Sequence, residues 1–202
     1  MKKKIAILGS TGSIGKSILK IISKDKKNFE IVLLSANKNY KEIIKQAKLF
    51  NVRNVILKDE KSYEIVKVKL KKKKINVYNN YESFNKIFKH KIEYVMSSIV
   101  GIDGLYPTYK IIKYTKKIAI ANKESIICAW NLINNELKKN KTEFIPVDSE
   151  HFSIWYALKN NLGRGINKIY LTASGGSLLN VPKKEINKLK IKDVLSHPNW
   201  KM

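Results

Sequence analysis

Short apolar segments alternate with amphipathic segments along most of the chain. In the amphipathic segments, apolar residues recur at intervals of three and four, as at Ile14, Ile18, Leu19 and Ile22, which predicts helices. The strands expected between these helices are Lys4–Leu8, Ile31–Ala36, Asn54–Leu57, Ile75–Tyr78, Tyr94–Ser97, Lys117–Ala121 and Glu143–Pro146. Alternating strands and helices are typical of βα units with right-handed crossovers on a parallel sheet. The pattern therefore predicts a doubly wound α/β domain over residues 1–146, with ligands at the carboxyl ends of the strands.

The pattern changes after Pro146, which indicates a second region over residues 147–202. We expect a helix over Ser149–Leu158, a loop over Asn160–Asn167, a strand over Lys168–Ala173 and a short polar helix over Lys183–Leu189.

The composition argues against a membrane-spanning or secreted protein. The longest apolar runs contain only a handful of residues, far short of the roughly 20 that span a bilayer. The segment Met1–Gly9 imitates a signal peptide, but its apolar stretch is shorter than the ~7 residues that such a signal needs. Cys128 is the only cysteine and cannot form an internal disulfide. We therefore expect a cytoplasmic protein without a membrane partner.

The formal net charge of +25 raises the alternative of a basic nucleic-acid-binding protein, whose signature would be salt-sensitive retention on DNA or RNA. Arginine, which such proteins favour for bidentate and stacking contacts, occurs only at Arg53 and Arg164. Abundant lysine, asparagine, isoleucine and tyrosine are instead typical of A+T-rich codon usage. We therefore expect no nucleic-acid partner, and we interpret Lys71–Lys74 as a solvated turn between a helix and a strand.

A glycine-rich loop, Gly9, Gly12 and Gly15, lies between the first expected strand and a helix from Ser13. In this context the backbone N–H groups and the helix N-terminus can cradle a phosphate. The spacing is looser than GxGxxG, and a tight turn can need glycine for steric reasons alone. Position and context favour a nucleotide site.

The second expected strand ends in Asn37-Lys38-Asn39. An NAD-binding protein carries an acid there for the ribose 2′-hydroxyl, whereas a cation suits a 2′-phosphate. The segment therefore favours NADPH.

Two helix starts carry polar side chains that allow two interpretations. Asn122-Lys123-Glu124-Ser125 is ordinary helix-capping chemistry, but at the carboxyl edge of the sheet it can also contact a phosphorylated or carbonyl substrate. Asp148 and Glu150 are either a cap and a first-turn acid or a pair of carboxylates for Mg²⁺ or Mn²⁺. We favour the metal for this pair, and interpret His151 as a packing or surface residue.

Near the end of the chain, Thr172–Gly176 places small hydroxyl side chains beside flexible backbone. This segment is either a bulge or a substrate contact. His197 and Trp200 flank Pro198, and they belong either to a frayed tail or to an active-site lid.

Five motifs in unbroken order resemble the family of 1-deoxy-D-xylulose 5-phosphate reductoisomerases. They are ILGSTGSIG at Ile7–Gly15, ANKES at Ala121–Ser125, VDSEH at Val147–His151, TASGG at Thr172–Gly176 and HPNWKM at His197–Met202. The resemblance implies a Rossmann-like NADPH-binding domain over residues 1–146, then the beginning of an α+β catalytic domain over residues 147–202. The reaction it implies is the rearrangement and NADPH-dependent reduction of a sugar phosphate in non-mevalonate isoprenoid synthesis, by a homodimer.

The resemblance also implies a role for each matching residue. Thr11, Gly12, Ser13 and Ile14 would hold the cofactor pyrophosphate, Asn37, Lys38 and Asn39 the adenosine phosphate, and Asn122 and Glu124 would line the rest of the NADPH site. Lys123, Ser149, Glu150, Ser174, His197 and Trp200 would contact substrate, with Lys123, Asp148, Glu150 and His197 catalytic. Asp148 and Glu150 would ligate Mg²⁺ or Mn²⁺, and Trp200 and Met202 would belong to a closing flap.

The family continues beyond these motifs with a DSAT…NKGLE segment and a helical C-terminal domain, which supply the third metal carboxylate and the substrate-phosphate contacts. The resemblance therefore covers only an N-terminal part, and we expect the chain alone to bind NADPH without catalysing the reaction. Two local departures are Asn37 in place of a usual glycine and Lys201 where a small residue is common. Another NADP-dependent reductase of the same fold is the alternative, because the glycine loop and Lys38 would suit it equally.

Overall fold

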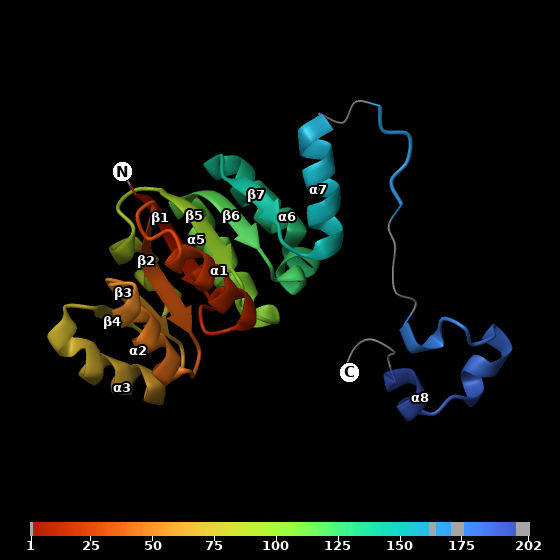
Figure 1. Ribbon diagram of the computed structural model, residues 1–202, viewed down its shortest axis with the longest axis horizontal. Helices are drawn as coiled ribbons and strands as arrows, with labels where there is room; N and C mark the ends of the chain where they lie inside the picture. Colours follow the sequence, from red (N-terminus) through yellow and green to blue (C-terminus); the bar gives the residue numbers. More distant parts are fainter. Residues whose placement is uncertain (1, 162–164, 171–175, 197–202) are drawn as a thin grey trace. The chain divides into compact units, whose positions relative to one another are not determined.

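The computed structural model describes residues 2–161, 165–170 and 176–196. The chain divides into two compact units, Met1–Trp155 and Tyr156–Met202, and each is described by itself. In the first unit, helices cover both faces of one sheet (Figure 1).

The sheet of the first unit has seven strands, all parallel, in the order β4-β3-β2-β1-β5-β6-β7. The strands are β1 (Lys3–Leu8), β2 (Phe29–Ala36), β3 (Asn54–Leu57), β4 (Asn76–Tyr78), β5 (Ile92–Ser97), β6 (Thr115–Ile120) and β7 (Glu143–Pro146). The chain builds outward from β1 first toward β4 and then, from β5 onward, in the other direction. The order therefore reverses between β1 and β5, which makes their carboxyl ends the topological switch point.

Of the helices of the first unit, the first six bury residues against the sheet, and the seventh is half-buried or exposed in its described part. The helices are α1 (Ser13–Ser23), α2 (Tyr40–Leu49), α3 (Glu60–Leu70), α4 (Phe84–Ile87), α5 (Leu105–Ile111), α6 (Lys123–Asn140) and α7 (Ser149–Asn161), which continues into the second unit. Short 3₁₀ turns occur at Lys71–Lys73, Tyr81–Ser83, Ile102–Gly104 and Ile112–Tyr114. Within the described parts of the chain, no helix is both long enough and apolar enough to cross a membrane.

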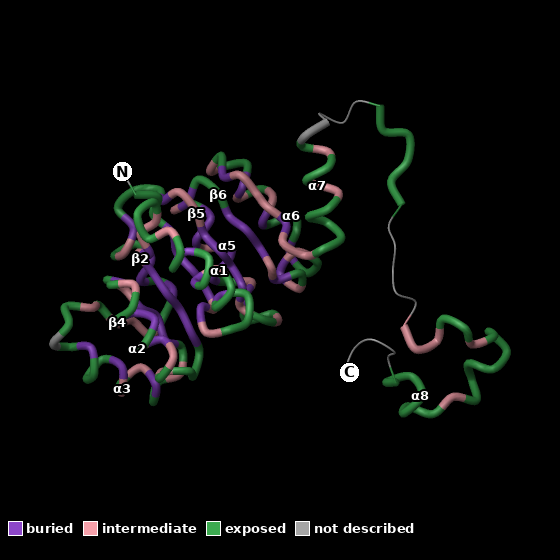
Figure 2. The backbone as a smooth tube through the Cα atoms, viewed as in Figure 1, coloured by how far each residue is buried: buried purple, intermediate pink, exposed green. Residues whose placement is uncertain are grey.

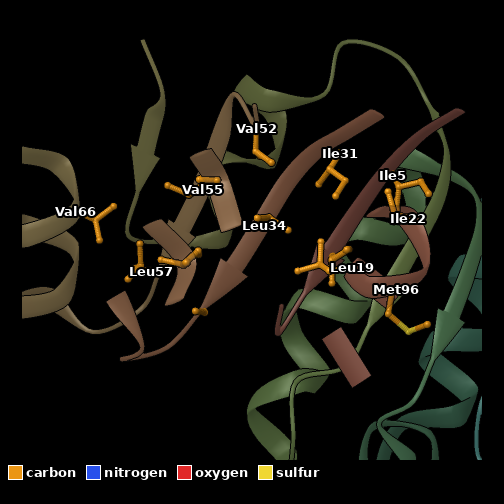
Figure 3. Packing of buried hydrophobic residues seen from close by; sticks show 14 of the residues in the cluster. Ile5, Leu19, Ile22, Ile31, Leu34, Val52, Val55, Leu57, Val66 and Met96 are labelled. Atoms are coloured by element: carbon orange, nitrogen blue, oxygen red, sulfur yellow. The ribbon is translucent and has the colours of Figure 1, made fainter. Parts of the chain in front are cut away.

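Two apolar clusters fill the space between the helices and the two faces of the sheet, because successive side chains of a strand point to opposite sides. Ile5 and Ile7 of β1 join residues of α1, α2 and α3, and Figure 3 shows Ile5 close to Ile22 of α1. Ala6 and Leu8 join residues of α4, α5 and α6 on the other face. The central strands are consequently the most deeply buried segments (Figure 2).

The seven strands predicted for the first domain all form, with boundaries within two residues of those expected. The doubly wound α/β prediction is confirmed. Lys71–Lys73 form a turn between α3 and β4, and Lys74 follows in the left-handed conformation (φ +53°), as a solvated turn would require.

The described residues of the second unit are mostly exposed and hold only short helical segments after α7. These are Gly176–Leu178, Lys183–Lys188 and α8 (Ile191–Leu195). The predicted polar helix near Lys183 therefore forms, as a 3₁₀ helix. The predicted strand over Lys168–Ala173 is wrong for its described part, Lys168–Tyr170, which has no strand structure. A strand needs a hydrogen-bonded neighbour for its backbone groups, and none exists among the described residues of this unit.

Candidate functional site

The glycine loop after β1 brings three backbone segments close together. Gly9 has φ +80°, and a Cβ there would lie 2.7 Å from the Ser98 carbonyl oxygen. A Cβ on Gly15 would lie 2.5 Å from the Gly9 carbonyl oxygen and 2.6 Å from the Ser10 Cα. Gly9 and Gly15 are therefore needed for steric reasons, because no side chain fits at either position.

Gly12 is different, because a Cβ there would meet only the Gly9 carbonyl oxygen, at an ordinary 3.4 Å. Gly12 is the N-cap of α1 and provides no side-chain acceptor for the first-turn amides. Such amides bind anions well, because the positive end of the helix dipole adds to their hydrogen bonds. The fold does not need a glycine at this position, so an approaching ligand explains it better than packing does.

Hydrogen bonds from the neighbouring strands fix the position of the loop. The Gly9 amide donates to Ser35 Oγ (3.1 Å), and the Ser10 amide donates to the Ser35 carbonyl (2.9 Å). On the other side, Ser98 Oγ donates to the Leu8 carbonyl (2.7 Å). Because the loop is tied to the ends of both β2 and β5, its free amides are pre-organised rather than ordered by a ligand.

A cleft of about 790 Å³ opens at the switch point, over the carboxyl ends of the first five strands. Its walls are Gly9, Thr11 and Gly12 after β1, Ser35, Ala36 and Asn37 at the end of β2, Lys58 after β3, Asn80, Tyr81 and Glu82 after β4, and Ser98, Ile99, Val100, Ile102, Asp103, Tyr106 and Pro107 after β5. Open α/β sheets bind their ligands at this location, and the volume lies in the range of small-molecule sites.

No acid follows the second strand on the cleft wall, as the sequence indicated. Asn37 lines the cleft, and Asn39 caps α2 by accepting the Glu42 amide (3.2 Å). Asp59, which follows β3, already caps α3 by accepting the Ser62 hydroxyl (2.8 Å) and amide (3.0 Å). These two hydrogen bonds, and more weakly the charges of Lys38 and Lys61, hold the pKa of Asp59 below its usual value against a smaller effect of desolvation.

At the start of α6 the structure supports the capping interpretation of Asn122, because both the oxygen and the nitrogen of its side-chain amide have hydrogen-bond partners within the protein. Asn122 is buried, its Oδ1 accepts the Ser125 amide (2.6 Å), and its Nδ2 donates to the carbonyls of Ile99 and Gly101. A Cβ on Gly104 would overlap this amide, so the loop after β5 is fitted to Asn122. The exposed Lys123 and the half-buried Glu124 follow at the same edge of the sheet.

At the start of α7 the capping interpretation also holds for Asp148. Asp148 Oδ1 accepts the His151 amide (2.9 Å) and lies 2.5 Å from His151 Nδ1. Burial raises the pKa of Asp148, but the two hydrogen bonds from His151 outweigh it and leave the pKa lowered. Glu150 Oε2 accepts the Ser149 hydroxyl (3.0 Å). Among the described residues, no three His, Cys, Asp or Glu side chains gather as a metal centre.

The parallel sheet brings the predicted residues to one edge, because they follow β1, β2, β6 and β7. Of the predicted cofactor residues, Thr11, Gly12 and Asn37 line the cleft. Ser13 and Ile14 begin α1, Lys38 and Asn39 precede α2, and Asn122 and Glu124 begin α6. Lys123, Asp148, Ser149 and Glu150 lie at the starts of α6 and α7, outside the cleft wall. Ser174, His197, Trp200 and Met202 lie outside the described residues.

The sequence reasoning missed the cleft residues that follow β3, β4 and β5. Lys58, Asn80, Tyr81 and Asp103 carry polar groups on this wall. The signal was available, because the residue after every strand of a parallel sheet faces the same edge. None of these four residues belongs to the five motifs that carry the family resemblance.

A doubly wound parallel sheet with a glycine loop and a cleft at its switch point defines a dinucleotide-binding α/β protein. Two family models match the chain. Residues 5–130 match 1-deoxy-D-xylulose 5-phosphate reductoisomerase, and residues 144–202 match the C-terminal domain of the same enzyme. The chain belongs to the 1-deoxy-D-xylulose 5-phosphate reductoisomerase family.

Individual relatives agree with this assignment. The chain is 60% identical to the reductoisomerase of Pelagibacter ubique over 99% of its own length and 52% of that protein, and 40% identical to that of Clostridium tetani over 99% and 53%. Among solved structures, it is similar to the Zymomonas mobilis reductoisomerase in complex with NADPH (TM-score 0.87, 28% identity, 98% of this chain and 52% of the other). It is also similar to a reductoisomerase in complex with NADPH, fosmidomycin and magnesium (TM-score 0.79, 30% identity, 99% and 52%). The chain spans about half the length of the curated relatives it matches.

Proposed function

We propose that the protein to which this chain contributes is a 1-deoxy-D-xylulose 5-phosphate reductoisomerase. It would convert its substrate to 2-C-methyl-D-erythritol 4-phosphate by a rearrangement and an NADPH-dependent reduction that requires a divalent metal, in non-mevalonate isoprenoid biosynthesis. The observation that carries the proposal is the family match over both parts of the chain, joined to a cleft at the switch point of the sheet.

The residues around the cleft suit NADPH. Gly12 leaves room and unblocked amides at the N-terminus of α1, where a pyrophosphate would be held, with Thr11, Ser13 and Ile14 around it. The end of β2 provides Asn37, Lys38 and Asn39 in place of the acid that would hold an unphosphorylated ribose. When bound, NADPH would supply the hydride, and the protein would orient it.

The start of α7 suits a hard cation such as Mg²⁺ or Mn²⁺. Asp148 and Glu150 offer carboxylate oxygens in one helical turn, and the lowered pKa of Asp148 keeps its carboxyl ionised. A cation held there would act as a Lewis acid and orient substrate oxygens.

The remaining assignments follow from the family. Lys123, Ser149, Glu150, Ser174, His197 and Trp200 would contact the sugar phosphate, and Lys123, Asp148, Glu150 and His197 would be catalytic. We assign residues 1–146 to cofactor binding and residues 147–202 to the metal and substrate domain. We further propose a cytoplasmic homodimer with no nucleic-acid partner.

An assay of the longer protein with deoxyxylulose phosphate, NADPH and Mn²⁺ tests the proposal. We expect NADPH oxidation that depends on both the substrate and the metal. Oxidation supported by a different carbonyl compound, and none with deoxyxylulose phosphate, would favour another NADP-dependent reductase.

A further inference from the structure

Lys58 occupies a position on the cleft wall that no part of the family assignment above explains. It directly follows β3, the strand beside β2, and its amide donates to the Ala36 carbonyl at the end of β2 (3.2 Å). In the register of the two strands Ala36 lies opposite Leu57, so Lys58 lies beside Asn37. Lys58 is thus next to the place where a Rossmann-type sheet binds the adenosine ribose.

The charge of Lys58 is not neutralised by a carboxylate in the described structure. Its Nζ lies 5.8 Å from the centre of the Tyr81 ring, and no ion pair of the described residues includes it. Glu82 lines the same cleft but pairs with Lys110 (3.3 Å). Asp103 also lines the cleft and acts on the Tyr81 hydroxyl, but no ion pair of the described residues joins it to Lys58. A cation held over an aromatic ring and outside any such ion pair attracts an anionic ligand.

Lys38, the cation that the sequence singled out, is in a different situation. Lys38 does not line the cleft, and its charge acts on Asp59, whose pKa it helps to lower. Lys58 is therefore a second cation near the end of β2, and it lines the cleft itself.

We propose that Lys58 binds the 2′-phosphate of NADPH and is a specificity-determining residue for this cofactor. The inference rests on the proposed function, because it presumes that the cleft binds a dinucleotide. The lysine ammonium on a flexible stem can meet a phosphate from the neighbouring strand, whereas the ribose hydroxyl of NADH would give it no charged partner.

Titration of the 202-residue chain with NADPH and, separately, with NADH tests the inference. Lys58→Met removes the charge and retains the aliphatic stem. We expect it to weaken NADPH binding about tenfold, the effect of losing one charge-assisted hydrogen bond, and to leave NADH binding within about twofold. Lys58→Arg should restore most of the NADPH affinity, and the NADPH affinity of Lys58→Met should depend less on salt.

Lys139→Met is the matched control, since Lys139 is an exposed lysine near the far end of α6 and its removal changes the net charge equally. We expect it to leave both affinities unchanged. Unchanged NADPH affinity in Lys58→Met would overturn the inference, and so would an equal loss for NADPH and NADH, which would show a role in folding or in contacts common to both cofactors. A wild-type chain that binds neither cofactor would instead show that this cleft is not a dinucleotide site and would overturn the inference at its premise, while the activity assay of the longer protein tests the proposed function separately.

Discussion

Gly12 and Gly15 should respond differently to replacement by alanine, because Gly12 is open to the cleft and Gly15 is enclosed by backbone. In Gly15→Ala the new Cβ would lie 2.5, 2.6 and 2.7 Å from three backbone atoms of Gly9 and Ser10. Backbone cannot rotate away as a side chain can, so α1 must shift from the loop. In Gly12→Ala the new Cβ meets one atom at 3.4 Å, at φ −77° and ψ 174°, a conformation that alanine adopts freely.

At Gly15 the cost of overpacking should exceed the gain in helix propensity, so we expect Gly15→Ala to destabilise the protein. Replacing a helical glycine with alanine normally stabilises by about 1 kcal/mol. Overpacking costs about 1–3 kcal/mol, and three contacts this short place Gly15→Ala near the upper end. We therefore expect a net loss of about 1–2 kcal/mol in the free energy of unfolding, or roughly 2–8 °C in Tm for a chain of this size. Gly12→Ala should lose less than about 1 kcal/mol, from its slightly poorer N-cap.

Gly12→Ala, the less destabilising of the two substitutions, should have the more direct effect on cofactor binding. Gly12→Ala places a methyl group where the pyrophosphate would approach the α1 amides, and we expect about a tenfold or greater loss of NADPH affinity with the fold intact. Urea unfolding followed by circular dichroism, with NADPH titration of the folded variants, gives both quantities. A Gly15→Ala variant at least as stable as wild type would refute the close-contact reasoning. Equal stability losses for the two variants would refute the distinction between them.

Four further substitutions test other parts of the site. Lys38→Asp should shift the cofactor preference toward NADH, because it repels a 2′-phosphate and supplies a ribose acceptor; equal wild-type affinity for NADPH and NADH in a titration would contradict this. Burial raises the pKa of Tyr81 from 10.0 to about 12, against a smaller lowering by Ser35, so the stability it contributes is complete below about pH 10 and lost as the pH rises toward about 12. In Tyr81→Phe the tyrosinate absorbance should be lost near pH 12, whereas a loss near pH 10 would show that Tyr81 ionises as an ordinary tyrosine. In the longer protein, Asp148→Asn and Glu150→Gln should each abolish metal-dependent turnover and leave NADPH binding nearly intact, whereas near-normal turnover at low Mg²⁺ would identify the residue as a cap only.

The sequence was sufficient to predict the sheet and its binding edge, because periodicity reports directly on burial in a parallel sheet. Ile5 and Ile7 alternate with Ala6 and Leu8 between two clusters, and each strand is apolar on both faces. The predicted strand at Lys168–Ala173 was wrong in its described part because periodicity does not report on strand pairing. A strand is stable only beside a neighbour, and an apolar run carries no information about whether a neighbour exists.

The candidate site was predictable where local chemistry decides and unpredictable where tertiary contacts decide. The capping roles of Asn122 and Asp148 are local, so both their capping and functional interpretations could be named in advance. The place of Lys58 depends on the pairing of β3 with β2, which no local pattern reports. The difference between Gly12 and Gly15 depends on how closely α1 approaches Ser10, and spacing alone gives both residues the same significance.

The cap formed by Asp148 is compatible with a metal at the start of α7. It limits which carboxylate oxygen of Asp148 would be open to the metal. Both hydrogen bonds from His151 go to Oδ1, so a cation would bind through Oδ2. A helix N-terminus carries roughly half a positive charge, which repels a cation. Asp148 alone would offset that half charge, and Glu150 in the same turn would leave a net negative field for a cation held there. Asparagine caps a helix about as well as aspartate but carries no charge. Asp148→Asn therefore separates the two roles: it should retain the helix while removing the charge on which the cation depends.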